Sequence, residues 1–133
     1  MNIIRKVALA VFKDKKMLMA RSAKHEFVFY TPGGKIEAGE SEADALKREI
    51  QEELHAQIDE ASLEFLHEFE APAHGRIDTL VNIRLYKGTL LSKPKASGEV
   101  AEISYFDSTV DEKHLSEPGK LIFAWAKKRG YMG

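Results

Sequence analysis

The strongest constraint on the fold is a change of hydrophobic period directly after a glycine-rich loop. Residues 31–40, TPGGKIEAGE, combine one proline with three glycines, a composition typical of a loop. In residues 41–55, SEADALKREIQEELH, apolar positions recur every three or four residues, which predicts an amphipathic helix that begins after Ser41 as N-cap. Such a helix needs a core to pack on, and its predicted buried stripe is Ala43, Leu46, Ile50 and Leu54.

The rest of the chain supplies segments for that core. Alternation of apolar and polar residues, with aromatic and β-branched types, predicts strands on both sides of the helix. A second amphipathic segment, 116–130, predicts a closing helix capped by Ser116 and ended by Gly130. The order strands, helix, strands, helix predicts an α/β (α+β) fold, a mixed sheet with helices packed on it. The predicted strands are 6–13, 16–21, 26–30, 61–71, 78–91 and 100–107.

Composition limits the class of protein. The chain has 133 residues, 44% hydrophobic and 31% charged, which predicts a single folded domain over residues 1–133. The absence of cysteine excludes disulfides, thiol catalysis and cysteine-zinc sites. A net charge of −1 argues against binding to a nucleic-acid polymer or a membrane surface. The first apolar run is too short for a signal peptide or a membrane span, so we expect a cytoplasmic protein, monomeric or homodimeric.

One face of the first helix is strongly acidic. At about 100° per residue, Glu49, Glu52 and Glu53 fall on one side, next to the buried stripe, and Glu42 projects into the same arc. Two interpretations remain open from this pattern alone. The carboxylates are either a solvated surface, where their repulsion costs only a few tenths of a kcal/mol, or ligands of a hard cation such as Mg²⁺ or Mn²⁺.

The spacing of these residues resembles the Nudix box, the signature of the Nudix hydrolase family. The box is a glycine, five residues, Glu, seven residues, Arg-Glu, an aliphatic residue, one residue, and Glu-Glu, followed by one residue, a glycine and an aliphatic residue. The lead-in PGGKIEAGE is similar to that of MutT-type members. The resemblance implies a mixed sheet sandwiched between helices. The sequence departs from the box at its end, where His55 and Ala56 take the places of the glycine and the aliphatic residue. The matching positions are Gly34, Glu40, Arg48, Glu49, Ile50, Glu52 and Glu53.

The resemblance implies a reaction and a set of residues that perform it. Nudix hydrolases cleave nucleoside diphosphates linked to another moiety, using Mg²⁺ or another divalent cation while water attacks phosphorus. The metal ligands are then expected to be Glu49, Glu52, Glu53 and the carbonyl of Gly33. These glutamates and Arg48, which braces them, form the expected catalytic set, with Glu49 able to act as general base. Glu40 is expected to support them or to bind a further ion. A last acidic ligand is expected from Glu99, or else Glu102.

The substrate is less constrained by the sequence. A small nucleotide is expected: a nucleoside triphosphate or modified triphosphate first, ADP-ribose or another conjugate second. Ser116 stands where enzymes specific for oxidised guanine carry an asparagine, and a serine lacks the paired donor and acceptor of an amide. The alternative is a domain of the same fold that senses nucleotides without turnover. Candidate substrate contacts are Lys35, Arg21, Tyr30, Arg84 and Ser116, with Phe27, Phe29 and Arg76 as further possibilities.

Overall fold

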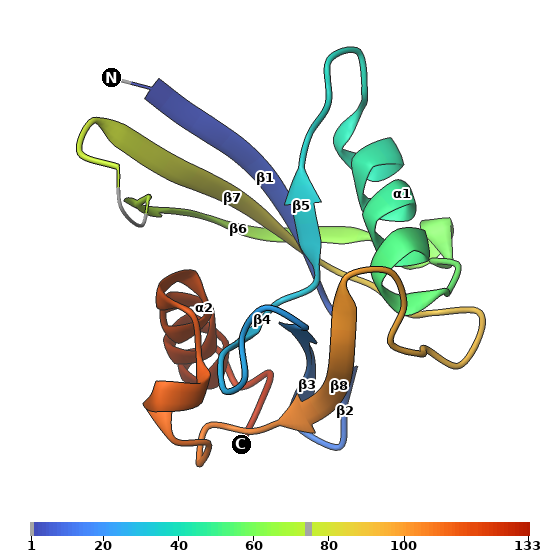
Figure 1. Ribbon diagram of the computed structural model, residues 1–133. Coiled ribbons are helices and arrows are strands. Elements are labelled where there is room, and N and C mark those ends of the chain that lie inside the picture. The colour runs from blue at the N-terminus through green and yellow to red at the C-terminus, as the bar shows by residue number, and fades with distance from the viewer. Residues whose placement is uncertain (1, 74–75) are drawn as a thin grey trace.

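The computed structural model describes residues 2–73 and 76–133 (Figure 1). It shows the predicted order of strands, a helix, more strands and a last helix. Short 3₁₀ turns at Glu60–Ser62 and Glu112–His114 precede β6 and α2. In chain order, the strands and helices are β1 Asn2–Ala10, β2 Phe12–Lys13, β3 Lys16–Ser22, β4 Phe29–Tyr30, β5 Gly33–Lys35, α1 Glu42–Leu54, β6 Glu64–Pro72, β7 Thr79–Lys87, β8 Val100–Phe106 and α2 Glu117–Lys128.

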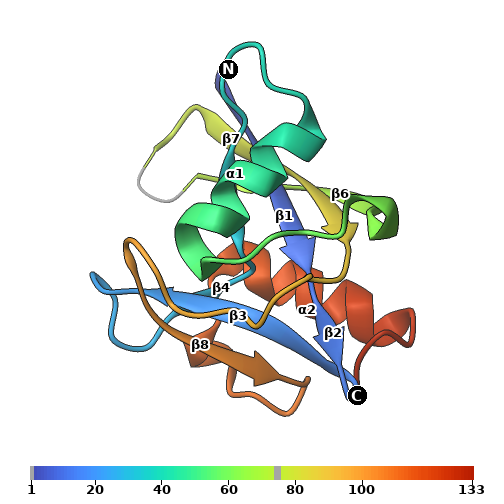
Figure 2. The same cartoon turned by 90° about the vertical axis from the view of Figure 1, so that its right-hand side faces the viewer.

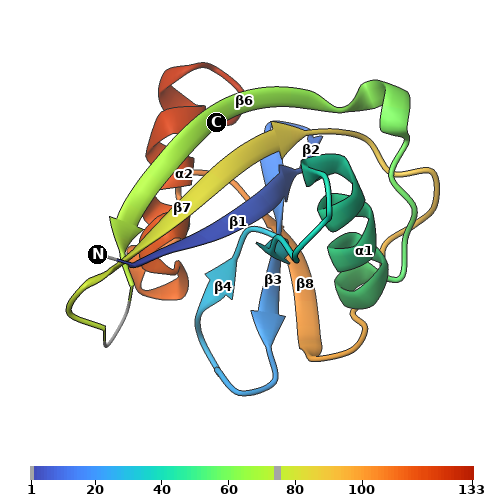
Figure 3. The ribbon, with the colours of Figure 1, turned by 90° about the horizontal axis from the view of Figure 1, so that it is seen from above.

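The strands form two sheets. The first has the order β5-β1-β7-β6 and is mixed, because β1 is parallel to β7 and antiparallel to β5. The second contains β2, β3 and β4, with β8 also paired to β3. Figure 3 shows β3 and β8 running across the direction of β1 and β7. Strand β5 therefore lies at an edge of the first sheet, next to the start of α1 (Figure 1).

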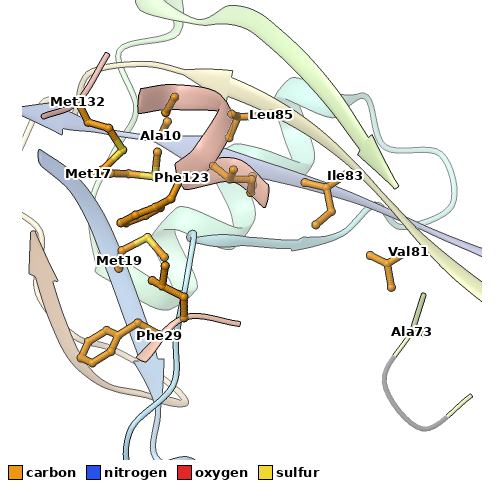
Figure 4. Packing of buried hydrophobic residues seen from close by; sticks show 14 residues of the cluster. Ala10, Met17, Met19, Phe29, Ala73, Val81, Ile83, Leu85, Phe123 and Met132 are labelled. Atoms are coloured by element: carbon orange, nitrogen blue, oxygen red, sulfur yellow. The ribbon is translucent and has the colours of Figure 1, made fainter. Parts of the chain in front are cut away.

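Two hydrophobic clusters place a helix on each face of the strands. Side chains alternate along β1, so Val7 and Leu9 pack with α1, while Ala8 and Ala10 pack in the cluster that contains α2. Figure 2 shows α1 in front of β1, and Figure 4 shows the core on the α2 side, with Phe123 among the labelled side chains. The predicted mixed sheet between helices is confirmed.

Element boundaries differ from the prediction where side chains carry little signal. The first strand, predicted at 6–13, is Asn2–Ala10 in the structure. It therefore begins four residues earlier and ends three residues earlier than predicted. The strand expected at 26–30 is only Phe29–Tyr30, and the loop predicted at 31–40 contains β5. A strand made of Gly-Gly-Lys has almost no side-chain alternation from which it could be recognised.

The first helix agrees more closely with its prediction. Ser41 accepts a hydrogen bond from the Asp44 backbone N–H at 3.1 Å, so it caps the helix as expected. The buried stripe is Ala45, Leu46, Ile50 and Leu54, so the expectation for Ala43 is wrong. Ala43 is half-buried in the first turn of the helix, whereas Ala45 is buried in the core. Residues 72–76, the turn-like segment between the strands predicted at 61–71 and 78–91, include two that lie outside the described part of the chain.

Candidate active site

The candidate site is built on the free edge of β5. Opposed residue pairs in an antiparallel ladder alternate between hydrogen-bonded and non-hydrogen-bonded. Leu9 donates to the Pro32 carbonyl at 2.8 Å, so the next opposed pair, Gly33 with Ala8, is non-hydrogen-bonded. The N–H and C=O of Gly33 therefore point away from β1, toward α1. The N–H donates to Glu53 Oε1 at 3.2 Å, and the carbonyl is available to a ligand.

The two glycines of β5 allow this close approach in different ways. A Cβ on Gly33 would lie 2.0 Å from the Val7 carbonyl oxygen, and its φ of +149° is rarely adopted by other residues. A Cβ on Gly34 would lie 2.6 Å from the Glu49 carboxylate. Gly33 thus preserves the backbone pairing, whereas Gly34 makes the space that the Glu49 carboxylate occupies.

Glu49 and Glu53 share this space, and Glu53 is largely buried. Burial, a hydrogen bond with Glu49 and the charges of Glu49 and Glu52 raise the pKa of Glu53 well above its ordinary value of 4.5. Glu52 is further out, with its side chain 60% exposed and 3.7 Å from Arg48 Nη1. Within residues 2–73 and 76–133, no three His, Asp or Glu side chains are grouped tightly enough to hold a metal ion. Two of the three predicted carboxylates are therefore brought together, and Glu52 is next to them.

Arg48 connects the loop, β5 and the helix. Its guanidinium donates to Glu40 at 2.8 and 2.9 Å, to Glu49 Oε1 at 2.7 Å and to the Lys35 carbonyl at 3.0 Å. This geometry agrees with the expected bracing role and gives Glu40 a supporting position. The hydrogen bonds from Arg48 lower the pKa of Glu40 to about 2, with help from the N–H of Glu37.

The loop before β8 reaches the end of α1. Ser97 and Lys95 donate backbone hydrogen bonds to the carbonyls of Glu53 and Leu54, at 3.0 and 2.8 Å. These are carbonyls that a helix end leaves without partners. The same loop carries Glu99, whose charge contributes to raising the pKa of Tyr30, after burial and the charges of Glu53 and Glu49. Glu99 is thus on the same side of the molecule as Glu53.

The helix ends at the position where the box normally has glycine. His55 adopts the left-handed conformation itself, with φ 49° and ψ 47°, and donates its backbone N–H to the Gln51 carbonyl. Its ring is exposed and lies 3.4 Å from the Gln51 side-chain amide. His55 therefore ends the helix in the left-handed conformation that the glycine of the box would otherwise adopt.

Several other candidates are engaged elsewhere. Arg21 pairs with Glu102 across β3 and β8 at 3.1 Å, which leaves Glu99 as the acidic residue nearer the site. Arg84 donates to Glu42 at 2.8 Å and also pairs with Glu68, linking α1 to β7 and β6. Glu42 is therefore paired with Arg84 and is not grouped with Glu49 and Glu53.

The aromatic candidates lie in three different environments. Phe29 is buried in the core, in edge contact with Phe106, so stacking of a base on Phe29 is excluded (Figure 4). Phe27 is 61% exposed and its ring contacts His114. Tyr30 is beside Glu53, and burial and the neighbouring carboxylates raise the pKa of its phenol. Of the three, Phe27 has the most exposed ring, and Tyr30 is the one that lies beside the carboxylates.

The last candidates lie around β5 and the start of α2. The Ser116 hydroxyl accepts from the Gly119 N–H at 3.1 Å, so it is occupied as the helix cap. Arg76 is exposed in the loop before β7. Lys35 is exposed and lies opposite Lys6 in the β1–β5 ladder. Burial and the charge of Lys35 lower the pKa of Lys6, and Glu49 and Glu53 act in the opposite direction. Lys6 could not be singled out from the sequence, because only the register between β1 and β5 brings it opposite Lys35.

The residues present suit a hard divalent cation. The Gly33 carbonyl, Glu49 and Glu53 supply oxygen donors, the class that Mg²⁺ and Mn²⁺ prefer. Burial, and after it the neighbouring Glu49 and Glu52, raise the pKa of Glu53, and a bound cation would offset the charge that these carboxylates bring together. The charges of Glu52 and Glu99 also act at the site, on Glu53 and on Tyr30 respectively.

Comparison with known proteins assigns the chain to a family. The family description NUDIX domain matches residues 3–121. A search of curated proteins finds no match. Solved structures share the fold. A nudix hydrolase family member from Chromobacterium violaceum has 24% identity and a TM-score of 0.78, over 97% of this chain and 80% of that one. A MutT NUDIX hydrolase from Burkholderia pseudomallei has 16% identity and a TM-score of 0.80, over 93% and 98%.

A third structure was solved with ligands. It is a bifunctional NMN adenylyltransferase/ADP ribose pyrophosphatase from Francisella tularensis, complexed with AMP and a Mn ion. It has 19% identity and a TM-score of 0.67, over 97% of this chain and 42% of that one. At these identities the structures show the fold, and the family match covers most of the sequence. The chain therefore belongs to the Nudix hydrolase family.

Proposed function

We propose that this Nudix hydrolase cleaves the pyrophosphate linkage of a small nucleoside diphosphate derivative with Mg²⁺ or Mn²⁺ as cofactor. The observation that carries the proposal is the pair of carboxylates, Glu49 and Glu53, held against the Gly33-Gly34 edge of β5. A solvated acidic face would not require a glycine at the position where the Glu49 carboxylate packs. The site residues and the cytoplasmic location remain predictions.

Each residue has a role that follows from its position. A divalent cation, when bound, would neutralise the diphosphate and lower the pKa of an attacking water. Glu49, Glu53 and the Gly33 carbonyl would hold it, with Glu52 and Glu99 as further ligands. Arg48 fixes the Glu49 carboxylate through its 2.7 Å hydrogen bond. Glu49 is the candidate to accept a proton from water, as its position in the Nudix box implies.

The substrate class rests on the charge that the site can neutralise. A pyrophosphate linkage carries the anionic oxygens that a hard cation and nearby ammonium groups bind. We propose a nucleoside triphosphate or modified triphosphate as the first substrate class and ADP-ribose or another conjugate as the second. The occupied hydroxyl of Ser116 argues against a reader of oxidised guanine at that position.

The test is a product analysis with matched variants. The protein is incubated with Mg²⁺ and nucleoside triphosphates, oxidised deoxynucleotides, ADP-ribose, dinucleoside polyphosphates and nucleotide sugars. We expect Glu49→Gln and Glu53→Gln each to lower kcat by roughly a hundredfold or more, because each removes a charge that acts on the transition state. Glu64→Gln is the control, since Glu64 is exposed on β6 and pairs with Lys87 at 3.5 Å.

Two results would contradict the proposal. Unchanged turnover in both glutamine variants would remove the site assignment. Nucleotide binding without turnover of any substrate would instead indicate a sensing domain.

A further inference from the structure

Two lysines face each other in the β1–β5 ladder. Lys6 on β1 is the direct partner of Lys35 on β5. By the same alternation that frees the Gly33 carbonyl, this is a non-hydrogen-bonded pair, the kind in which opposed side chains are closest. Like charges directly opposite each other destabilise a sheet. The pair therefore has an energetic cost that the sheet itself does not explain.

Neither lysine has a close counter-ion. Within the described residues, neither ammonium group lies within 4.0 Å of a carboxylate oxygen. Lys6 is nevertheless half-buried, although lysines normally keep their charge in water. It lies on the same face of β1 as Ala8, which packs in the cluster on the α2 side. A half-buried ammonium group beside a second one is a position suited to an anion.

The position relative to the carboxylates adds to this argument. Lys6 lies two residues before Ala8, the partner of Gly33, and Lys35 lies two residues after Gly33. The side chains of both lysines share the face of Ala8 and Gly33, and the Gly33 N–H holds the Glu53 carboxylate at the edge of the sheet, where the two faces meet. The charges of Glu49 and Glu53 reach Lys6 there and act on its pKa against the effect of burial. Once the charge of these carboxylates is neutralised by a cation, the two ammonium groups make the neighbouring surface positive.

We propose that Lys6 and Lys35 together bind a phosphate group of the substrate beside the Glu49 and Glu53 site. This inference rests on the proposed function, because it concerns the phosphate chain that the reaction cleaves. It identifies Lys6 as a substrate-binding residue and makes Lys35 one half of a two-lysine site. A phosphate bridging the two ammonium groups would also offset their mutual repulsion.

The experiment measures binding of a probe that has no base or sugar. Inorganic tripolyphosphate is titrated into the protein by calorimetry, with and without Mg²⁺, at several salt concentrations. We expect Lys6→Met to weaken binding about tenfold and to reduce its salt dependence, because one charge-assisted hydrogen bond is lost. Lys6→Arg keeps the charge and should retain most of the affinity.

The matched control lies on the same strand. Arg5→Met removes one positive charge from β1, but the Arg5 side chain is on the opposite face from Lys6 and Lys35 and is near Glu68, whose pKa its charge helps to lower. We expect Arg5→Met to bind tripolyphosphate with wild-type affinity. Circular dichroism on each variant separates loss of binding from loss of folding, and Lys6→Arg provides a folded comparison if Lys6→Met is unstable.

The outcomes separate this inference from the proposed function. Tripolyphosphate binding that is absent in the wild type, or equal in wild type and Lys6→Met, overturns the two-lysine site. Nucleotide hydrolysis with unchanged KM and kcat in Lys6→Met overturns it too, while leaving the proposed function intact. Lys6-dependent tripolyphosphate binding without turnover of any nucleotide supports the two-lysine site and contradicts the hydrolase proposal.

Discussion

At the scale of single residues, the adjacent glycines Gly33 and Gly34 in β5 are required for different reasons. Gly33 has its backbone against Val7 and a positive φ, so its requirement is conformational. The three heavy atoms nearest to a Cβ on Gly34 all belong to the Glu49 carboxylate, the far end of a side chain. A methyl group at Gly33 would have to displace the backbone of Val7. A methyl group at Gly34 would have to displace the Glu49 carboxylate.

This difference predicts that alanine at Gly33 mainly affects stability, whereas alanine at Gly34 mainly affects metal binding. Gly33→Ala should lower the free energy of unfolding by on the order of 3 kcal/mol, because of backbone strain and a clash with the ladder. Gly34→Ala should cost less than about 1 kcal/mol in stability but weaken Mn²⁺ binding about tenfold, since Glu49 is displaced. Urea denaturation and Mn²⁺ titration by electron paramagnetic resonance measure the two effects. Equal stability loss in both variants would contradict this division.

At the scale of elements, α1 is fixed at both ends by segments outside it. Ser41 caps its start, and the loop that leads to β8 supplies N–H donors to its last carbonyls. The helix itself was predictable within one residue, because its period and cap are local features of the sequence. The loop contact was not predictable, because it depends on how residues 95–97 meet a helix end about 40 positions earlier.

The left-handed residue at the end of α1 gives a prediction about stability. His55 has φ 49°, a conformation that costs a non-glycine residue about 1 kcal/mol or more. His55→Gly should therefore raise the free energy of unfolding by about 1 kcal/mol, measured by urea denaturation. His55→Ala is the control and should give no such gain, because alanine pays the same conformational cost. A glycine variant no more stable than the alanine variant would show that the helix end carries no strain.

At the scale of the whole molecule, the sequence predicted the class of fold and the acidic helix but not the pairing between strands. The mixed sheet, the two helices and the convergence of Glu49 with Glu53 followed from periodicity and from the resemblance to the Nudix box. The Lys6–Lys35 pair and the Arg84–Glu42 bridge did not, because strand register joins residues that are far apart in the chain. Arg84 was proposed as a substrate contact on its charge alone, whereas the fold gives that charge two carboxylate partners.

The electrostatics of the site predict how stability depends on pH and cations. Burial, with Glu49, raises the pKa of Glu53 above 4.5 in the folded protein. As pH rises past about 4.5, the unfolded chain releases this proton first, so this group makes the metal-free protein less stable with rising pH. Glu53→Gln lacks the titration and should lose less stability between about pH 5 and pH 8 than the wild type.

Added Mg²⁺ should reverse this trend, because it binds the ionised carboxylate. At about 100 times its Kd, a cation adds about 2.7 kcal/mol to the free energy of unfolding, and the gain should be larger at high pH. Thermal unfolding with and without Mg²⁺ at two pH values measures it. A wild-type pH profile that matches Glu53→Gln, with no response to Mg²⁺, would contradict this account.

The free edge of β5 also bears on solubility. An exposed strand edge offers unpaired N–H and C=O groups to a strand of another molecule, which is a route to aggregation. Here the N–H of Gly33 is taken by Glu53 and the carbonyl of Lys35 by Arg48. The side chains proposed for chemistry therefore also block self-association at this edge. Variants at Glu53 or Arg48 that lose activity should consequently be examined by light scattering, because some of the loss will come from molecules that have joined edge to edge.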